Sequence, residues 1–251
     1  MKYSRLDEME KYIQEQKTVT IPQLQTRFMT SINTVRRDVA LLQKKGTVEK
    51  IYGGVRWRIG EHLTSFNVRS GRNKEAKEAI GKKAAGFVAD GDIIFLDSGT
   101  TTLQMVDQLA HLKDVTLITH NLQAVIIAAQ YPNIKVTILP GQLHRETSSF
   151  TGLETLRMLK SYNIRKAFMG ATGLSLHSGI SNSSSLEYEL KVTAIERSKE
   201  AYLLLDNQKF GETALLTFAS LAKFYGIITN IQPDASYIEA IRSAGSKLFI
   251  A

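Results

Sequence analysis

Apolar residues recur every three to four positions in three short stretches at the start of the chain, and this spacing predicts amphipathic helices. The first helix is expected over residues 5–16, the second after Thr20, and the third from Ser31 to about Lys45. A break is expected at residues 17–19. The buried stripes of the three helices are Leu6, Met9 and Ile13; Leu24 and Phe28; and Val35, Val39 and Leu42.

Residues typical of helix ends stand at the predicted boundaries. Thr20 is expected to cap the second helix, because Gln23 lies three residues later and Pro22 falls in the first turn, where a missing N–H does no harm. Ser31 is expected to cap the third helix, and Gly46 to end it. Two short helices joined by a tight turn form the helix-turn-helix pattern.

A β-hairpin is predicted directly after these helices. Residues 48–52 and 55–58 are strand candidates, separated by Gly53 and Gly54. Such a hairpin forms the wing of a winged helix-turn-helix domain and would lie along the DNA backbone or in a minor groove.

The rest of the chain alternates between apolar runs and helical patterns, which predicts an α/β domain with a largely parallel sheet. Residues 59–73 are polar and are expected to be a linker, so the predicted domains are 1–58 and 74–251. Strands are expected at 93–96, 115–118, 136–139, 166–169, 201–205, 224–228 and 248–250, and helices at 74–88, 101–109, 122–129, 153–159 and 186–199.

Charge is concentrated in the first part of the chain. Of a net charge of +8, residues 1–60 carry +6, from 12 Lys and Arg against 6 Asp and Glu. This imbalance indicates a polyanion-binding head, although lysines on a solvated surface would give the same count. The 251 residues contain no Cys and only scattered His, so no metal site or cofactor is expected. No apolar run is long enough for a membrane helix and the first residues are polar, so a cytoplasmic protein is expected.

The start of the third helix carries side chains suited to reading DNA. Asn and Arg match adenine and guanine edges in the major groove, whereas Ser and Thr match phosphates. A generic helical domain with a hairpin is the alternative. The expected DNA-binding residues are Ser31, Ile32, Asn33, Thr34, Arg36 and Arg37 on the helix, and Lys50, Tyr52 and Arg56 on the wing.

The segment after the strand at 93–96 has the character of an anion site. Asp97 ends the strand, and Ser98, Gly99, Thr100, Thr101 and Thr102 open a helix. Glycine lets the backbone approach a phosphate, while hydroxyls and free N–H groups face it. The segment lacks the Lys and glycine spacing of a Walker motif. A helix cap with spare hydroxyls is the alternative.

Two sets of residues resemble the DeoR family of transcriptional regulators. The run Asn33-Thr-Val-Arg-Arg-Asp38, with Leu42, Gly46 and the segment 52–55, is similar to the winged-helix head of that family. The resemblance implies that Arg36 and Arg37 lie on the recognition helix. Because phosphates repel a carboxylate, Asp38 is expected to fix an arginine or the turn and not to touch DNA.

The polar residues at the strand ends, taken in order, resemble the DeoR-family effector domain, whose fold is similar to ribose-5-phosphate isomerase. The resemblance implies that Ser98, Gly99, Thr100 and Thr101 hold a sugar phosphate. Gly141, which follows a strand at the same sheet edge, is a further expected effector-binding residue. The sequence departs from the family's pattern at four places. His120 interrupts the usual Thr-Asn pair, and Pro140 replaces a glycine. Thr172 stands where many relatives carry Asp, and Asn207-Gln208 replaces the commoner His-Ser. The rest of the pocket is implied to be Asp97, Asn121, Gly152, Glu187, Lys191, Asp206 and Lys209.

Four segments, 149–152, 162–169, 186–191 and 202–206, are similar to the branch of repressors that control inositol catabolism. This likeness implies a keto-deoxy-gluconate phosphate as effector. A surface ion pair is the alternative for Asp206 and Lys209.

The function expected from these features is a repressor of a carbohydrate-catabolism operon, released by a phosphorylated sugar. Its partners are expected to be double-stranded operator DNA, the sugar phosphate and further copies of the chain in a homodimer or homotetramer, with no membrane. Activation is the alternative to repression. A sugar-phosphate isomerase with a fused nucleic-acid-binding head is a rival hypothesis, with Asp97, Glu187, Asp206 and Lys209 as candidate catalytic groups. An RNA-binding factor would need stacking platforms, for which Tyr52 and Trp57 are too few.

Overall fold

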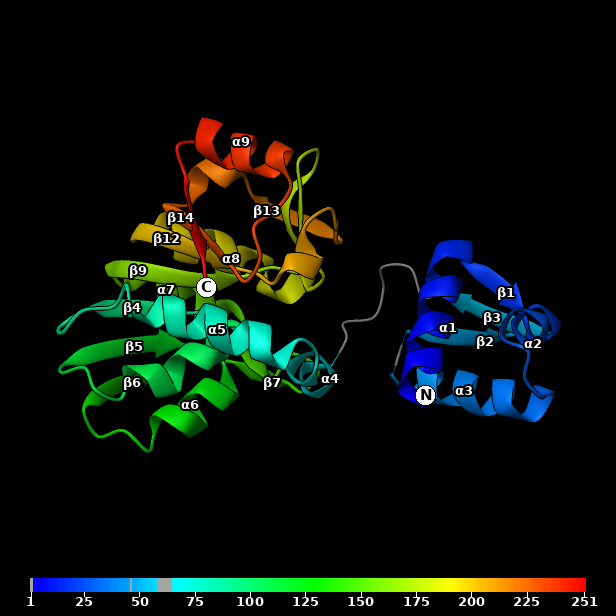
Figure 1. The fold of residues 1–251 in the computed structure, drawn as a ribbon. Helices are drawn as coiled ribbons and strands as arrows, with labels where there is room; N and C mark the ends of the chain where they lie inside the picture. The colour runs from blue at the N-terminus through cyan, green and yellow to red at the C-terminus, as the bar shows by residue number, and fades with distance from the viewer. Residues whose placement is uncertain (1, 46, 58–64) are drawn as a thin grey trace. The chain divides into compact units, whose positions relative to one another are not determined.

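A computed structural model of the chain describes residues 2–45, 47–57 and 65–251. The chain forms two compact units, Met1–Thr64 and Ser65–Ala251 (Figure 1). Each unit encloses its own apolar core. The two are therefore described separately.

The first unit is a winged helix-turn-helix domain, as predicted. Its small sheet has the order β1-β3-β2, and both pairings are antiparallel. The predicted stripes form its core, in which Met9, Ile13, Leu24, Val35 and Leu42 are fully buried. The elements are α1 (Lys2–Gln16), β1 (Thr18–Thr20), α2 (Ile21–Phe28), α3 (Ile32–Lys45), β2 (Val48–Ile51) and β3 (Gly54–Trp57).

The predicted caps are present, whereas the predicted break is not. The Thr20 hydroxyl accepts a hydrogen bond from the Gln23 N–H at 3.3 Å, and the Gln23 side chain accepts one from the Thr20 N–H at 2.8 Å. The expectation of a break at 17–19 is wrong, because Thr18–Thr20 is a strand that pairs with β3. Three residues are too few for periodicity to reveal a strand. Gly46 and Arg58, expected to end the helix and the wing, lie outside the described residues.

The second unit is built on a seven-stranded, wholly parallel sheet with the order β15-β14-β12-β9-β4-β5-β6. Each of the seven predicted strands matches one of these, with ends displaced by up to three residues. The strands are β4 (Ile93–Leu96), β5 (Val115–Thr119), β6 (Ile134–Ile138), β9 (Ile164–Gly170), β12 (Ser198–Leu204), β14 (Gly226–Thr229) and β15 (Lys247–Ile250).

Helices and short strands surround this sheet. None of the helices in the described part of the chain is long and apolar enough to cross a membrane. The helices are α4 (Phe66–Gly71), α5 (Lys74–Ala85), η1 (Thr102–Leu109), α6 (Leu122–Ala128), α7 (Leu153–Ser161), α8 (Ser185–Glu196), η2 (Asn207–Lys209), η3 (Leu221–Lys223) and α9 (Ala235–Ser243). The short strands are β7 (Gln142–His144) and β8 (Ser149–Thr151), which form a hairpin, and β10 (Gly173–Ser175), β11 (Gly179–Asn182) and β13 (Leu216–Ala219), which form a small sheet.

Helices cover both faces of the sheet. Along β4, Ile94 and Leu96 belong to one buried cluster and Phe95 to the other, because successive strand residues point to opposite faces. The first cluster includes residues of α5, η1 and α6, and the second includes residues of α7, α8 and α9. The unit is thus a three-layer doubly wound fold (Figure 1).

The chain order reverses beside β4. From β4 the chain adds β5 and β6 on one side, and it then crosses to the other side to add β9, β12, β14 and β15. The carboxyl ends of β4 and β9 therefore flank the topological switch point, where open α/β sheets bind ligands.

Several expectations for this unit are corrected by the structure. Residues 66–71 form α4 inside the expected linker, and Phe66 is buried in the core. The helix expected at 101–109 is a 3₁₀ helix, and the helices expected to end at 88 and 199 end at Ala85 and Glu196. The α9 helix and the five short strands were missed, because short elements carry too few residues to show a period.

Candidate functional site

The start of α3 presents its predicted polar face outward. The Ser31 hydroxyl accepts from the Thr34 N–H at 3.2 Å, which confirms Ser31 as the cap. Arg36 and Arg37 are exposed. Asn33 is also exposed, and Ile32 is 38% exposed, whereas Thr34 is half-buried. The helix therefore has a basic and amide-bearing surface of the kind that enters a major groove.

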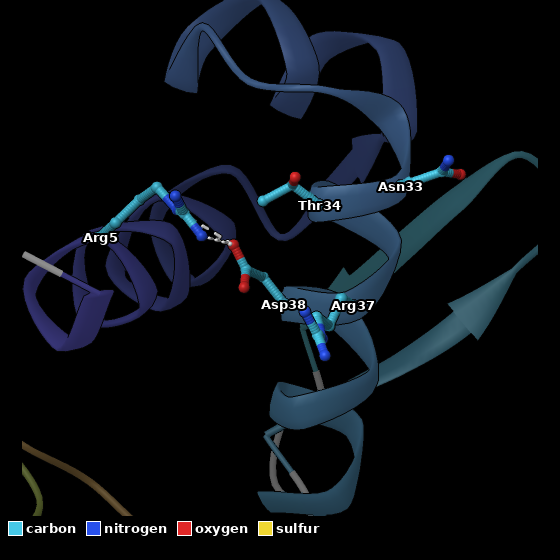
Figure 2. A pocket seen from close by; sticks show the side chains of 5 residues that line it. All are labelled: Arg5, Asn33, Thr34, Arg37 and Asp38. Carbon is cyan, nitrogen blue, oxygen red and sulfur yellow. Dashed lines mark hydrogen bonds and ion pairs between the residues drawn. The ribbon is translucent and has the colours of Figure 1, made fainter.

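Asp38 is held away from this surface by Arg5 of α1. Nε of Arg5 donates to Asp38 Oδ2 at 3.1 Å, and one terminal nitrogen donates to the same oxygen at 2.7 Å. Asp38 is buried, at 2% exposure. The prediction that Asp38 fixes an arginine is confirmed. Figure 2 shows the contact between Arg5 and Asp38. The two residues line a hollow of about 350 Å³ together with Asn33, Thr34 and Arg37.

The wing carries its predicted residues at the surface. Tyr52 lies at the tip of the hairpin and is fully exposed, and Lys50 is exposed on β2. Arg56 of β3 faces Glu49 across the hairpin at 3.5 Å; Arg56 is exposed and Glu49 is half-buried. Such a surface pair is weak, so Arg56 can exchange Glu49 for a phosphate at little cost.

The predicted anion loop lies at the switch point of the second unit. Ser98, Thr100 and Thr101 are buried, and the loop leads into η1. The first N–H groups of a helix have no partner within the helix, so this turn directs donors toward the switch point. A Cβ on Gly99 would lie 3.1 Å from Thr102 Oγ1, which is closer than an ordinary contact, so a larger residue would have to displace the Thr102 hydroxyl.

The hydroxyls of the loop are not equivalent. Thr102 Oγ1 donates to carbonyl oxygens of Asp97 and Gly99, at 2.9 and 2.8 Å, and so serves the loop itself. Thr101 occupies the cap position of η1 without a capping hydrogen bond from its side chain. Neither side chain is therefore an ordinary helix cap, because a capping hydroxyl accepts from a backbone N–H.

Asp97 is the centre of a buried charge network. Its Oδ2 accepts from Lys191 Nζ at 2.5 Å and from the Gly170 N–H at 2.9 Å, and Lys191 also donates to the Gly170 carbonyl at 3.0 Å. Burial alone would raise the pKa of Asp97, but Lys191 and the contact with His120 outweigh it and lower the pKa below its usual value. Asp97 is therefore a carboxylate in the folded protein.

Glu187 of α8 ties the anion loop to the β7–β8 hairpin. Its Oε1 accepts from the Ser98 hydroxyl at 2.5 Å and from the Ser149 hydroxyl at 2.9 Å. Glu187 is buried at 4% exposure. The structure therefore places Glu187, Lys191 and Asp97 together beside the loop.

Asp206 lies at the end of β12, surrounded by cations. It is 1% exposed and accepts from the Asn73 amide at 3.1 Å, so the alternative of a surface ion pair is wrong. Burial lowers the pKa of Lys209, and it lowers the pKa of Lys77 to about 8, with Asp206 opposing the shift in both. Burial also lowers the pKa of Arg69, opposed by Glu187 and Asp97.

The remaining predicted residues have structural roles at the same sheet edge. The Asn121 side chain caps α6, and Gly152 stands at the cap position of α7. Gly141 has φ +151°, and a Cβ there would lie 2.7 Å from the Thr151 carbonyl oxygen, so the close approach requires glycine. Gly141 therefore shapes the hairpin and offers no side chain to a ligand.

Sequence reasoning missed several residues of this site. His120 was noted only as a departure from the usual pattern, but it is fully buried against Asp97 and Phe95. Arg69 and Lys77 fell in or beside the expected linker, and a search for basic residues flanking that segment would have found them. Within residues 2–45, 47–57 and 65–251, no group of three His, Asp or Glu is arranged to hold a metal ion.

Two family models match the chain. Residues 5–58 match a DeoR-like helix-turn-helix domain, and residues 72–231 match the DeoR C-terminal sensor domain. The match to the helix-turn-helix domain ends at residue 58, which is the expected end of the first domain. The match to the sensor domain begins at residue 72, within the segment 59–73 that was expected to be a linker.

Curated relatives match along nearly the whole length. The chain is 41% identical to the HTH-type transcriptional regulator IolR of Bacillus subtilis, over 95% of each chain. It is 31% identical to the lactose phosphotransferase system repressor of Staphylococcus epidermidis, over 96% of this chain and 99% of the relative. Among solved structures, ribose 5-phosphate isomerase A of Methanocaldococcus jannaschii matches with 22% identity and a TM-score of 0.40, over 55% of each chain.

Proposed function

Because the chain belongs to the DeoR family of helix-turn-helix transcriptional regulators, we propose that it represses a carbohydrate-catabolism operon and releases the operator when a phosphorylated sugar binds. The observation that carries the proposal is the site at the switch point of the sheet. There the Ser98–Thr102 loop meets the buried Asp97–Lys191 pair. A keto-deoxy-gluconate phosphate is the effector to test first, because the chain shares 41% identity with IolR.

The first unit binds double-stranded operator DNA through α3 and the wing. Arg36, Arg37 and Asn33 are exposed for base and phosphate contacts, and the Arg5–Asp38 pair removes the one carboxylate of this turn from the interface. Ser31, Ile32, Thr34, Lys50, Tyr52 and Arg56 complete the proposed surface.

The second unit binds the phosphate at the Ser98–Thr102 loop. Thr100 and Thr101 offer hydroxyls, the start of η1 offers N–H groups, and Lys77 and Lys209 add positive charge near Asp206. The sugar shifts the protein toward the released state only if it binds that state more tightly than the DNA-bound state.

The protein acts as a regulator and not as an isomerase. Enolisation needs a base free to take a proton from carbon, whereas Asp97 is paired with Lys191, and Glu187 accepts from two hydroxyls. Thr172 stands where an acid is expected, and its N–H donates to the Ser181 carbonyl. Isomerised product after incubation with pentose and hexose phosphates would contradict this assignment.

The functional form is at least a homodimer in the cytoplasm. A single winged head buries too little surface for specific binding, so two heads are needed to read paired half-sites. A homotetramer would bridge two such sites.

Gel retardation with the DNA upstream of the gene and its neighbours tests the proposal. The protein should retard this fragment, and a sugar phosphate from a panel that includes keto-deoxy-gluconate phosphates should release it, while the unphosphorylated sugars should not. The proposal fails if the fragment is not retarded, or if no phosphorylated sugar changes the retardation.

A further inference from the structure

The hollow of about 350 Å³ in the first unit is lined by side chains from two helices. Arg5 belongs to α1, whereas Asn33, Thr34, Arg37 and Asp38 belong to α3 (Figure 2). All five side chains are polar or charged. A group that occupies this hollow must therefore replace the hydrogen bonds that water makes to them, which an apolar group cannot do.

The charges that line the hollow favour an anion. Two guanidinium groups and one carboxylate, those of Arg5, Arg37 and Asp38, leave a net charge of +1. Asp38 is buried and already bound by Arg5. Arg37 is exposed, and its guanidinium forms no ion pair with any residue that the structure describes. The first turn of α3 also contains no acidic residue, and the positive end of a helix dipole attracts anions.

Asp38 fixes Arg5 without using all of its donors. Nε and one terminal nitrogen of Arg5 donate to the same atom, Asp38 Oδ2, at 3.1 and 2.7 Å. A guanidinium carries five N–H groups, so three remain for another acceptor. The Arg5 side chain is 31% exposed, whereas the Asp38 side chain is 3% exposed. Asp38 thus holds the guanidinium from the buried side, and a group fixed in this way loses less conformational entropy when it binds a ligand.

The hollow adjoins the surface proposed to read the operator. Asn33 and Arg37 belong to both, since each lines the hollow and is exposed at the start of α3. A duplex whose major groove admits α3 places its backbone phosphates beside this helix. Each phosphate carries one negative charge, which matches the net charge of the hollow, whereas base edges are uncharged. Two arginines can share the oxygens of one phosphate through charge-assisted hydrogen bonds.

We propose that Arg5 and Arg37 form a clamp for one phosphate of the operator backbone, and that Asp38 is the positioning residue that holds Arg5 in the clamp. This inference rests on the proposed function, because it requires α3 to bind DNA. The clamp fixes the register of the protein on the duplex and reads no sequence, since a phosphate is the same at every base pair. It gives α1, which lies outside the helix-turn-helix, a direct part in operator binding.

A charge-neutral double variant of the full chain, Arg5→Met with Asp38→Leu, tests the clamp. It removes one cation and one carboxylate, so the net charge stays at +8, and it leaves no unpaired charge where the buried pair was. Gel retardation with the DNA upstream of the gene should show an affinity about 10-fold to 100-fold lower than that of the wild type. The slope of log affinity against log salt concentration should become shallower by about one.

The matched control is Lys11→Met with Glu15→Leu. This pair of substitutions also removes one cation and one carboxylate, from exposed positions on the same helix. The control should bind the operator as tightly as the wild type, with the same salt dependence. Trp57 packs against the core of the first unit, so its fluorescence in urea checks that both double variants are folded.

Neutral phosphates distinguish a clamp from a role in folding alone. A methylphosphonate placed at one backbone position at a time removes the charge of that phosphate and leaves the bases unchanged. At the clamped position it should weaken binding of the wild type and of the control about 10-fold. At the same position it should leave the affinity of Arg5→Met with Asp38→Leu unchanged, because that variant has already lost the contact.

Wild-type affinity in Arg5→Met with Asp38→Leu would overturn the clamp. So would a double variant that responds to every methylphosphonate as the wild type does. A double variant that instead loses its preference at one base pair would assign the arginine to a base, and the clamp would again be wrong. If the wild type does not retard the DNA at all, the proposed function fails and the clamp with it.

Arg5→Lys covers the case in which the charge-neutral double variant does not fold. Lysine keeps a cation opposite Asp38, but its ammonium is a compact charge without the planar fork of donors that joins a carboxylate and a phosphate. The affinity of Arg5→Lys for the operator should fall about fivefold or more, with its preferences among altered operator sequences unchanged. An affinity equal to that of the wild type would refute the clamp.

Discussion

Replacing Lys191 by Met tests how much the buried Lys191–Asp97 pair contributes to the stability of the second unit. The Lys191 and Asp97 side chains are 4% and 1% exposed, and Nζ lies 2.5 Å from Oδ2. Removing one partner of such a pair leaves a buried charge uncompensated, which costs about 3–5 kcal/mol. For a unit of this size, that loss corresponds to a melting temperature about 6–20 °C lower.

The pH dependence of stability should change sign in the same variant. In the wild-type chain the pKa of Asp97 lies below its unfolded value, so the stability it contributes is complete above about pH 4 and is lost only as the pH falls further. Without Lys191, burial dominates and raises the pKa of Asp97 above the unfolded value. Stability is then present at low pH and lost as the pH rises, so Lys191→Met should become more stable from pH 8 to pH 5.

Urea unfolding of the full chain measures both effects. The single tryptophan, Trp57, lies in the first unit, so its fluorescence reports that unit, while circular dichroism reports the larger second unit. The fluorescence transition should not change in Lys191→Met. Asp97→Asn combined with Lys191→Met should recover more than half of the lost stability. A loss below about 1 kcal/mol, or a double variant no more stable than the single one, would refute the reasoning.

Three further predictions concern binding. Arg37→Ala should weaken operator retardation at least tenfold and leave sugar-phosphate binding unchanged; an operator affinity equal to that of the wild type would exclude this arginine from the interface. The DNA affinity of the wild-type chain should also fall steeply as the salt concentration rises. Thr100→Ala with Thr101→Ala should keep the operator bound at sugar-phosphate concentrations that release the wild type, and a double variant that still responds would place the phosphate elsewhere. Because burial lowers the pKa of Lys77 to about 8, sugar-phosphate affinity should fall as the pH rises from 7 to 9. Lys77→Met should flatten that profile in calorimetry, whereas Lys74→Met, at an exposed position on the same helix, should not.

The sequence by itself determined the parts of the molecule that depend on near neighbours. A capping residue contacts a residue three positions later, so Thr20 with Gln23 and Ser31 with Thr34 could be found without a fold. The strands of the large sheet were found because a buried parallel strand is a continuous apolar run. The loop after β4 was found because its composition suits an anion.

The tertiary structure decided which distant residues meet. Arg5 and Asp38 are 33 positions apart, and only the packing of α1 beside α3 brings them together. The order of the strands places the ends of β4 and β9 at the switch point, and no local pattern encodes that order.

The same limit explains the histidine that the sequence left without a role. His120 follows a predicted strand, and nothing in its neighbourhood along the chain indicates what its ring faces. The register of β4 against β5 sets it beside Asp97, and its Nδ1 lies 3.2 Å from the carbonyl oxygen of Phe150 in β8. Helix ends and buried strands are properties of short segments, whereas a hydrogen-bonding site is a property of segments that come together only when the chain folds.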